Sequence, residues 1–277
     1  MATDTPRNDR ILPLARFIAG AVVPFLLLAF LILYVSPQPT GRWFAWDINP
    51  RMTAAYMGAG YLGGAYFFLN TVFGTRWHRT AGGFLPVTAF TVAMLIVTVI
   101  HWDRFELTHL PFLAWLLLYI FTPVLVPLAW LRNRPADPGT PEVEDAAVPN
   151  LARWALLVLG VFLLLFAAVT IISPSFAMQI WPWTLSELTA RVLGGWSALL
   201  AVGGILISRE ERWSAWRIGL ESIALWHILV LIAAVLNRPD FKDGNLVNWY
   251  LISVVLVLIG MLVLYIQMQS RSRGNNT

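Results

Sequence analysis

The sequence predicts an all-α membrane protein with eight transmembrane helices, built as two tandem four-helix repeats in parallel orientation. Three observations predict this fold class. Hydrophobic residues make up 58% of the 277 residues and charged residues only 12%, against roughly 25% charged residues in a soluble domain. The apolar residues fall into eight blocks, and the first half of the chain matches the second half nearly in register.

Each apolar block is long enough to cross a membrane. A hydrocarbon core of about 30 Å requires about 20 apolar residues in a helix, and the blocks hold about 18 to 24. The expected helices cover residues 12–34, 53–73, 84–101, 112–131, 151–172, 188–207, 218–236 and 248–268. The first block is longer than the apolar region of a signal peptide and no small-residue cleavage pattern follows it, so we expect a retained helix.

The two halves match in rare residue types as well as in leucines. Leu14–Arg16 recurs 137 residues later as Leu151–Arg153, and Gly58–Phe105 aligns without a gap with Gly194–Phe241 at an offset of 136. The other matches are Ser36-Pro37 with Ser173-Pro174, Trp46 with Trp183, Arg76-Trp77 with Arg212-Trp213, and Trp115 with Trp249. Such self-similarity indicates internal duplication. Because a unit with four spans returns to its starting side, both copies insert in the same sense, related by an axis along the membrane normal.

The chain therefore divides into three parts. Residues 1–132 form the first four-helix repeat and residues 151–277 the second. Residues 133–150 form a linker that is rich in proline and acidic residues, a composition typical of solvated connections. Its position between the repeats suggests a hinge on the cytoplasmic side.

The distribution of basic residues predicts the orientation. With both termini in the cytoplasm, 13 of the 19 basic residues lie on the cytoplasmic side, as the positive-inside rule requires. Those 13 are Arg7, Arg10, Arg16, Arg76, Arg79, Arg132, Arg134, Arg153, Arg209, Arg212, Arg217, Arg271 and Arg273. We expect an integral protein of a bacterial-type plasma membrane, with the lipid bilayer as its main partner.

Aromatic residues gather in the loops on the other side. Trp43, Phe44 and Trp46 precede the second expected helix, and Trp181 and Trp183 precede the sixth. Tryptophan is enriched where a membrane meets water, so these segments are expected to anchor at the outer membrane surface. The alternative is an aromatic cup that holds a ligand.

His227 and Glu221 are the polar residues expected to lie within the membrane. Ionisable groups at such depth are costly and usually functional. The spacing of six residues sets the two side chains about 120° apart around the helix, so they need not touch. A binding or proton-handling role competes with a structural hydrogen bond to a neighbouring helix. The first half has Leu85 and Thr91 at these positions, so any site here occurs once.

A second group of candidates lies in the outer loops. His101, Asp103 and Arg104 follow the third expected helix and could bind a polar solute or form a salt-bridged rim. Glu187 and Arg191 stand four residues apart at the start of the sixth expected helix, where an ion pair is expected. Gly60 and Gly64 on the second expected helix have the GxxxG spacing that lets helix backbones approach closely.

No motif identifies an activity. The chain has no cysteine, and HExxH, GxSxG and paired acidic residues deep in the helices are absent. We expect no cofactor, no metal site and no nucleic-acid partner. Three hypotheses remain: a non-catalytic subunit or accessory of a membrane assembly, with protein partners or a homo-oligomer; a transporter or binder of a small or lipid-like solute; and a membrane-embedded enzyme.

Overall fold

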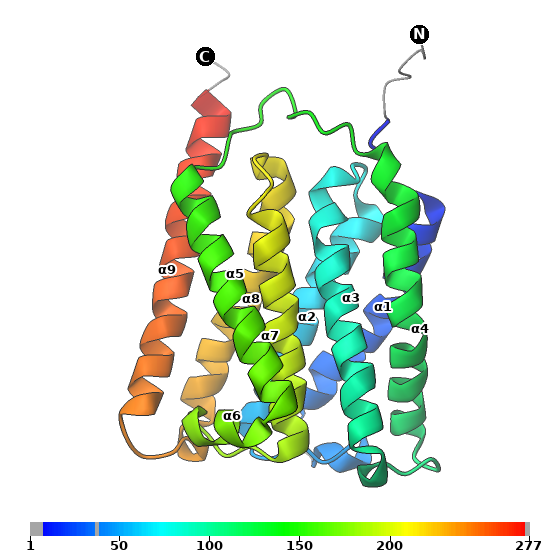
Figure 1. Ribbon diagram of the computed structural model, residues 1–277, viewed down its shortest axis with the longest axis vertical. Helices are drawn as coiled ribbons and strands as arrows, with labels where there is room; N and C mark the ends of the chain where they lie inside the picture. The colour runs from blue at the N-terminus through cyan, green and yellow to red at the C-terminus, as the bar shows by residue number, and fades with distance from the viewer. Residues whose placement is uncertain (1–7, 37–38, 275–277) are drawn as a thin grey trace.

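The protein is a bundle of long helices (Figure 1). The computed structural model describes residues 8–36 and 39–274, so Arg7, Pro37 and the side chain of Arg273, which entered the predictions above, lie outside its description. The long helices are α1 (Pro13–Phe30), α2 (Arg51–Phe73), α3 (His78–Ile100), α4 (Leu110–Asn133), α5 (Asn150–Ile172), α7 (Glu187–Ile207), α8 (Trp213–Leu236) and α9 (Asn245–Gly274). A π-helical turn (Leu31–Val35) extends α1, and the short helix α6 (Pro174–Ile180) follows α5.

Each of the eight expected helices is present, with one systematic difference. Helices α3 and α8 begin at His78 and Trp213, several residues before the expected starts at 84 and 218. The prediction started both helices at the first residue of the apolar block, but each helix already includes the more polar residues that precede the block. Helix α6 was not expected.

Seven of the long helices have the length and apolar composition of membrane spans, which is the architecture of a helical integral membrane protein. Helix α2 is the exception, because glycines and polar residues such as Thr53 and Asn70 lower its hydropathy. Most of α2 is buried between α1 and α8, so little of it needs to be apolar for contact with lipid. The helices thus match seven of the eight expected spans.

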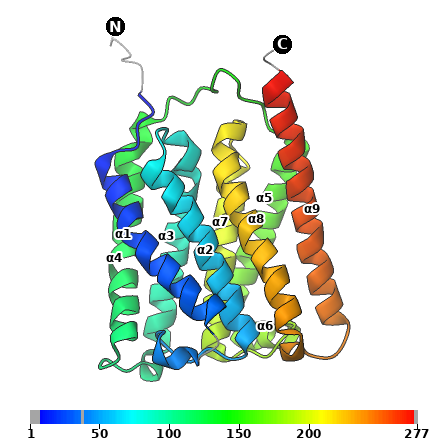
Figure 2. The same cartoon turned by 180° about the vertical axis from the view of Figure 1, so that it is seen from behind.

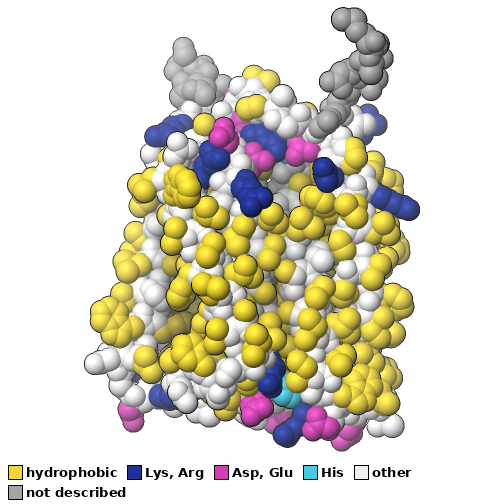
Figure 3. Space-filling view, in the orientation of Figure 1, with side chains coloured by type: hydrophobic (Ala, Val, Ile, Leu, Met, Phe, Trp, Pro, Cys, Tyr) yellow, Lys and Arg dark blue, Asp and Glu magenta, His cyan; other side chains and the backbone are white. Residues whose placement is uncertain are grey.

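The bundle has two charged ends and an apolar middle. Helix α1 begins and α9 ends at the same end, which we call the terminal end (Figures 1 and 2). The connection between α4 and α5 crosses this end, and α6 lies at the opposite, distal end. On the face shown in Figure 3, charged side chains gather at both ends and apolar side chains cover most of the surface between them. This banding is what a hydrocarbon layer around the middle requires.

Four helices form the centre of the bundle. Helix α2 packs on α8, α3 packs on α7, and α3 also contacts α8. The ring of Trp196 fills the space left by Gly60, where an added Cβ would lie 2.7 Å from the ring. Gly60 and Trp196 occupy aligned positions in the two halves. In the middle of the bundle, the large side chain of one half therefore packs against the glycine of the other. The close packing expected at Gly60 is confirmed, whereas Gly64 meets only an ordinary contact, at 3.5 Å.

Several contacts recur between aligned residues of the two halves. In the first pair, Trp77 N–H donates to the Asp9 carbonyl (2.9 Å) and Trp213 N–H donates to the Ala146 carbonyl (3.0 Å). In the second pair, the Arg16 guanidinium donates to the Val72 carbonyl (2.5 Å) and the Arg153 guanidinium donates to the Ser208 carbonyl (3.0 Å). Each half therefore ties the segment before its first helix, and the first turn of that helix, to the region between its second and third helices.

The aromatic loop residues do not form the surface belt expected for them. Trp183 is fully buried, and Phe44 and Trp46 are buried too, whereas Trp43 is 51% exposed. Trp46 packs edge-on against Phe105 and Trp183 packs edge-on against Phe241. The anchor interpretation is therefore wrong for these buried rings, because the loops fold inward over the distal end of the bundle.

Candidate functional site

A pocket of about 150 Å³ lies between α2, α8 and α9. It is lined by Tyr56, Trp226, His227, Val230, Tyr250, Ser253, Val254 and Val257. Tyr56 and Tyr250 lie five residues from the distal ends of α2 and α9, and His227 lies nine residues from the distal end of α8. At 1.5 Å per residue these positions are about 8 to 13 Å below the distal end. The pocket therefore lies in the distal half of the apolar layer.

Three polar groups of the residues that line this pocket have no hydrogen-bond partner among the described residues. The Nδ1 of His227 lies 2.8 Å from the Ile223 carbonyl. Since a carbonyl only accepts, Nδ1 carries the proton and Nε2 of the neutral ring is an acceptor. Within residues 8–36 and 39–274, no hydrogen bond involves this Nε2 or the hydroxyl groups of Tyr56 and Tyr250. Polar groups in an apolar layer normally have partners, so these three groups are exceptions to that rule.

Aromatic rings close the pocket toward the distal end. Trp181 and Trp183 both contact Tyr56 and Tyr250, at ring-centroid distances between 5.5 and 6.2 Å. The indole N–H of Trp226 donates to the Tyr56 carbonyl at 3.1 Å, which holds α8 against α2. Ser253 of α9 is exposed and forms the rim on the surface side. The pocket thus has a closed aromatic roof and an opening on the surface.

Glu221 does not share this pocket with His227. Its carboxylate accepts hydrogen bonds from the Arg217 guanidinium (2.8 Å), the Tyr265 hydroxyl (3.2 Å) and the Tyr66 hydroxyl. These partners come from α8, α9 and α2 respectively, so Glu221 joins the three helices nearer the terminal end. With its oxygens occupied, Glu221 has the contacts of a structural residue.

The distal candidates fall into two groups. His101, Arg191 and Glu187 come together: Arg191 Nη1 donates to His101 Nε2 at 2.9 Å and lies 3.4 Å from Glu187, so the expected ion pair is confirmed. Burial and then the positive charge of Arg191 lower the pKa of His101. Asp103 and Arg104 are instead an exposed pair 3.5 Å apart. The first group joins the end of α3 to the start of α7.

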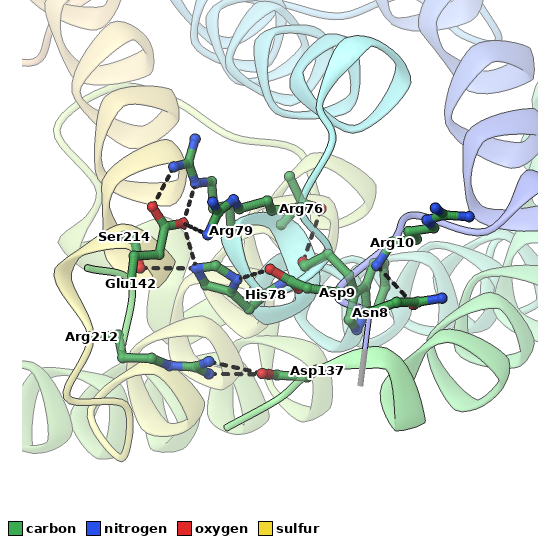
Figure 4. A network of polar contacts seen from close by, with 12 residues as sticks. Asn8, Asp9, Arg10, Arg76, His78, Arg79, Asp137, Glu142, Arg212 and Ser214 are labelled. Carbon is green, nitrogen blue, oxygen red and sulfur yellow. Dashed lines mark hydrogen bonds and ion pairs between the residues drawn. The ribbon is translucent and has the colours of Figure 1, made fainter. Parts of the chain in front are cut away.

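A polar network that was not predicted from the sequence surrounds His78 at the terminal end (Figure 4). His78 is buried, with Nδ1 2.6 Å from Asp9 Oδ2 and Nε2 2.9 Å from Ser214 Oγ and 3.0 Å from Glu142 Oε1. Arg79 donates to both oxygens of Glu142. Burial raises the pKa of Glu142, but Arg79, Arg76 and His78 together outweigh it, so the net pKa is lowered.

His78 lies between Asp9 and Ser214 as the histidine of a hydrolase triad lies between its aspartate and serine, but the protons are placed differently. A triad needs the histidine Nε2 to accept the serine proton. Here Nε2 faces the Glu142 carboxylate, which only accepts, and the Ser214 hydroxyl donates to Asp145. The network therefore joins the N-terminal segment, both halves and the linker, and it lacks an activated nucleophile.

The linker between the halves is attached at three of its carboxylates. Besides Glu142 and Asp145, Asp137 binds Arg212 through two hydrogen bonds, of 2.8 and 3.0 Å. Burial raises the pKa of Asp137, but the hydrogen bonds from Arg212 and from the Gly139 amide outweigh it and leave the pKa lowered. The acidic residues of the linker were expected to be solvated, but they bind residues at the starts of α3 and α8.

Comparison with known protein families, with curated proteins and with solved structures finds no match to this chain. The class of protein is therefore defined by its own helices and its site: a helical membrane protein with a polar-lined pocket between three helices.

Proposed function

We propose that this protein binds a lipid-like ligand in the pocket between α2, α8 and α9. The observation that carries the proposal is that His227, Tyr56 and Tyr250, which each have a polar group without a hydrogen bond among the described residues, line one pocket at the depth of membrane lipid. A ligand that enters through the opening beside Ser253 satisfies these groups. This is the second of the three hypotheses drawn from the sequence, in its ligand-binding form.

The pocket is lined mainly by α8 and α9 of the second half, and Tyr56 of α2 is its one lining residue from the first half. Tyr119 of α4 aligns with Ser253 of α9 in the register that pairs Trp115 with Trp249. Tyr119 is buried, lies 3.3 Å from the Tyr61 hydroxyl and packs against Phe90 and Trp115. In the first half Tyr119 fills this space, and in the second half the smaller Ser253 leaves it open. This difference supports a single ligand per chain.

Native mass spectrometry of the protein extracted in mild detergent tests the proposal. The wild-type protein should retain a small molecule, and Ser253→Phe, which fills the pocket opening, should lose it. Leu256→Phe is the matched control, because Leu256 is 62% exposed on the same helix and does not line the pocket; it should retain the ligand. A wild-type protein without ligand, or a ligand that persists in Ser253→Phe, contradicts the proposal. A protein partner recovered in place of a ligand favours the assembly-subunit hypothesis.

The proposed setting for this site is an eight-span bundle of two tandem repeats with the terminal end in the cytoplasm. The contacts that recur between aligned residues support the duplication, and the shared end of α1 and α9 supports an even number of spans. Orientation is tested with single cysteines, since the chain has none. Thr140 and Thr108 are exposed at the terminal and distal ends. On intact cells an impermeant thiol reagent should label Thr108→Cys and spare Thr140→Cys, and the reverse labelling overturns the orientation.

A further inference from the structure

We infer that the ligand is an uncharged amphiphile whose polar group is a hydroxyl. This inference rests on the proposed ligand-binding function and adds the chemical class of the ligand. Three properties of the pocket lead to it: the absence of charge in its lining, the hydrogen-bonding roles of its polar groups, and its volume and depth.

The pocket selects against a charged group. None of the eight residues that line it is Asp, Glu, Lys or Arg. The nearby Glu221 carboxylate is already bound by Arg217, Tyr66 and Tyr265. An ion placed in an apolar layer without a partner of opposite charge loses its hydration without compensation. A phosphate, carboxylate or ammonium headgroup therefore has no place beside His227.

The hydrogen-bonding groups require a donor as well as an acceptor. His227 Nε2 can only accept, because Nδ1 donates to the Ile223 carbonyl. The hydroxyls of Tyr56 and Tyr250 can donate. A carbonyl of an ester or ketone accepts from a tyrosine but leaves Nε2 unpaired, and an unpaired buried polar group is costly. One hydroxyl group on the ligand donates to Nε2 and accepts from a tyrosine, and so satisfies both sides.

The volume limits what can enter. A cavity of about 150 Å³ accommodates a molecule of about the size of benzene, which is the polar end of a lipid and a few carbons. The remaining chain must pass the exposed Ser253 and lie along exposed apolar residues of α9 such as Ile252 and Leu256. At about 8 to 13 Å below the distal end, the site lies deeper than a charged headgroup. Alcohols and phenols with a long apolar chain meet both conditions.

Equilibrium binding of three probes with the same long alkyl chain tests the inference on the full-length protein in lipid nanodiscs. The probes are a radiolabelled 1-alkanol, its methyl ether and its phosphate monoester. The alkanol should bind the wild-type protein at least tenfold more tightly than either of the others. His227→Phe removes the acceptor and Tyr250→Phe removes one hydroxyl while both keep an aromatic ring in place. Each should reduce the preference for the alkanol to less than threefold, with the thermal unfolding midpoint as the folding control.

The two levels of the proposal fail in different ways. If Ser253→Phe leaves binding of every probe unchanged, the pocket is not the binding site and the proposed function falls. If Ser253→Phe blocks binding but the wild-type protein binds the ether or the phosphate as tightly as the alkanol, the function stands and the hydroxyl inference is overturned. A preference for the alkanol that survives in His227→Phe also overturns it.

Discussion

The two halves of the molecule carry the same helices but close them differently. In the first half α4 packs on both α3 and α1. In the second half α9 packs on α8, and Met268 of α9 and Leu156 of α5 belong to one apolar cluster near the terminal end. Tyr119 fills the first half where Ser253 leaves the second open. Tyr119 and Ser253 are thus one of several aligned differences, with Thr91 and His227 as another, between the packed core of the first half and the pocket.

Opening the first half gives the largest expected effect. Tyr119→Ser removes a fully packed ring that contacts Phe90 and Trp115 and leaves the hydroxyl of Tyr61 without its partner. Deletion of a buried aromatic side chain costs about 3–5 kcal/mol. We expect a loss of that order in the free energy of unfolding, measured by denaturant titration in detergent micelles.

The control for this change is the aligned position in the second half. Ser253→Ala removes only an exposed hydroxyl that donates to its own helix, to the Tyr250 carbonyl at 2.7 Å, and should change stability by less than about 0.5 kcal/mol. Equal losses in Tyr119→Ser and Ser253→Ala would show that the two halves do not differ in packing at this position.

The centre of the bundle, where the halves meet, gives an intermediate effect. Gly60→Ala places a methyl group 2.7 Å from the Trp196 ring, and overpacking of this kind costs about 1–3 kcal/mol. Gly260→Ala on α9 is the matched control, since nothing lies within 4 Å of a Cβ at that position. Alanine is the better helix former by about 1 kcal/mol, so Gly260→Ala should not lower the unfolding midpoint. A destabilised Gly260→Ala with an unchanged Gly60→Ala would contradict the packing of the two halves around Trp196.

The helices could be predicted from the sequence because hydrophobic blocks bounded by charge are a local signal. The site could be predicted only in part. His227 was identifiable, since an ionisable group in an apolar block is rare. Tyr56 and Tyr250 were not, because aromatic residues are ordinary in such blocks and only the packing of α2, α8 and α9 brings them to one pocket. A comparison of Tyr119 with Ser253 in the aligned halves was the available signal.

The polar network of the terminal end was hidden for a different reason. His78 binds Asp9, Ser214 and Glu142, which lie 69, 136 and 64 residues away along the chain. No local pattern connects residues at such separations. Composition also misdirected the interpretation of the linker, because proline and acidic residues are typical of solvated segments. The arginines and the histidine that bind these carboxylates lie near the starts of α3 and α8.

The smallest expected effect concerns the distal contact between the halves, where His101 at the end of α3 accepts a hydrogen bond from Arg191 of α7. Burial and then the charge of Arg191 lower the pKa of His101 in the folded protein, whereas in the unfolded chain this pKa is about 6.5. Below that pH the unfolded chain binds a proton that the folded protein does not, so stability falls as pH falls until the folded pKa is reached.

His101→Gln keeps an acceptor for Arg191 but cannot titrate. We therefore expect the variant to lose less stability than the wild-type protein between pH 7.5 and pH 5.5. This difference should be smaller than the stability changes expected for Tyr119→Ser and Gly60→Ala, because a single titrating group contributes. The measurement is the unfolding midpoint at both pH values for both proteins, in which every other titrating group cancels. Parallel pH profiles would show that Arg191 and the burial of His101 do not oppose its protonation, and the contact would then join the halves without any dependence on pH.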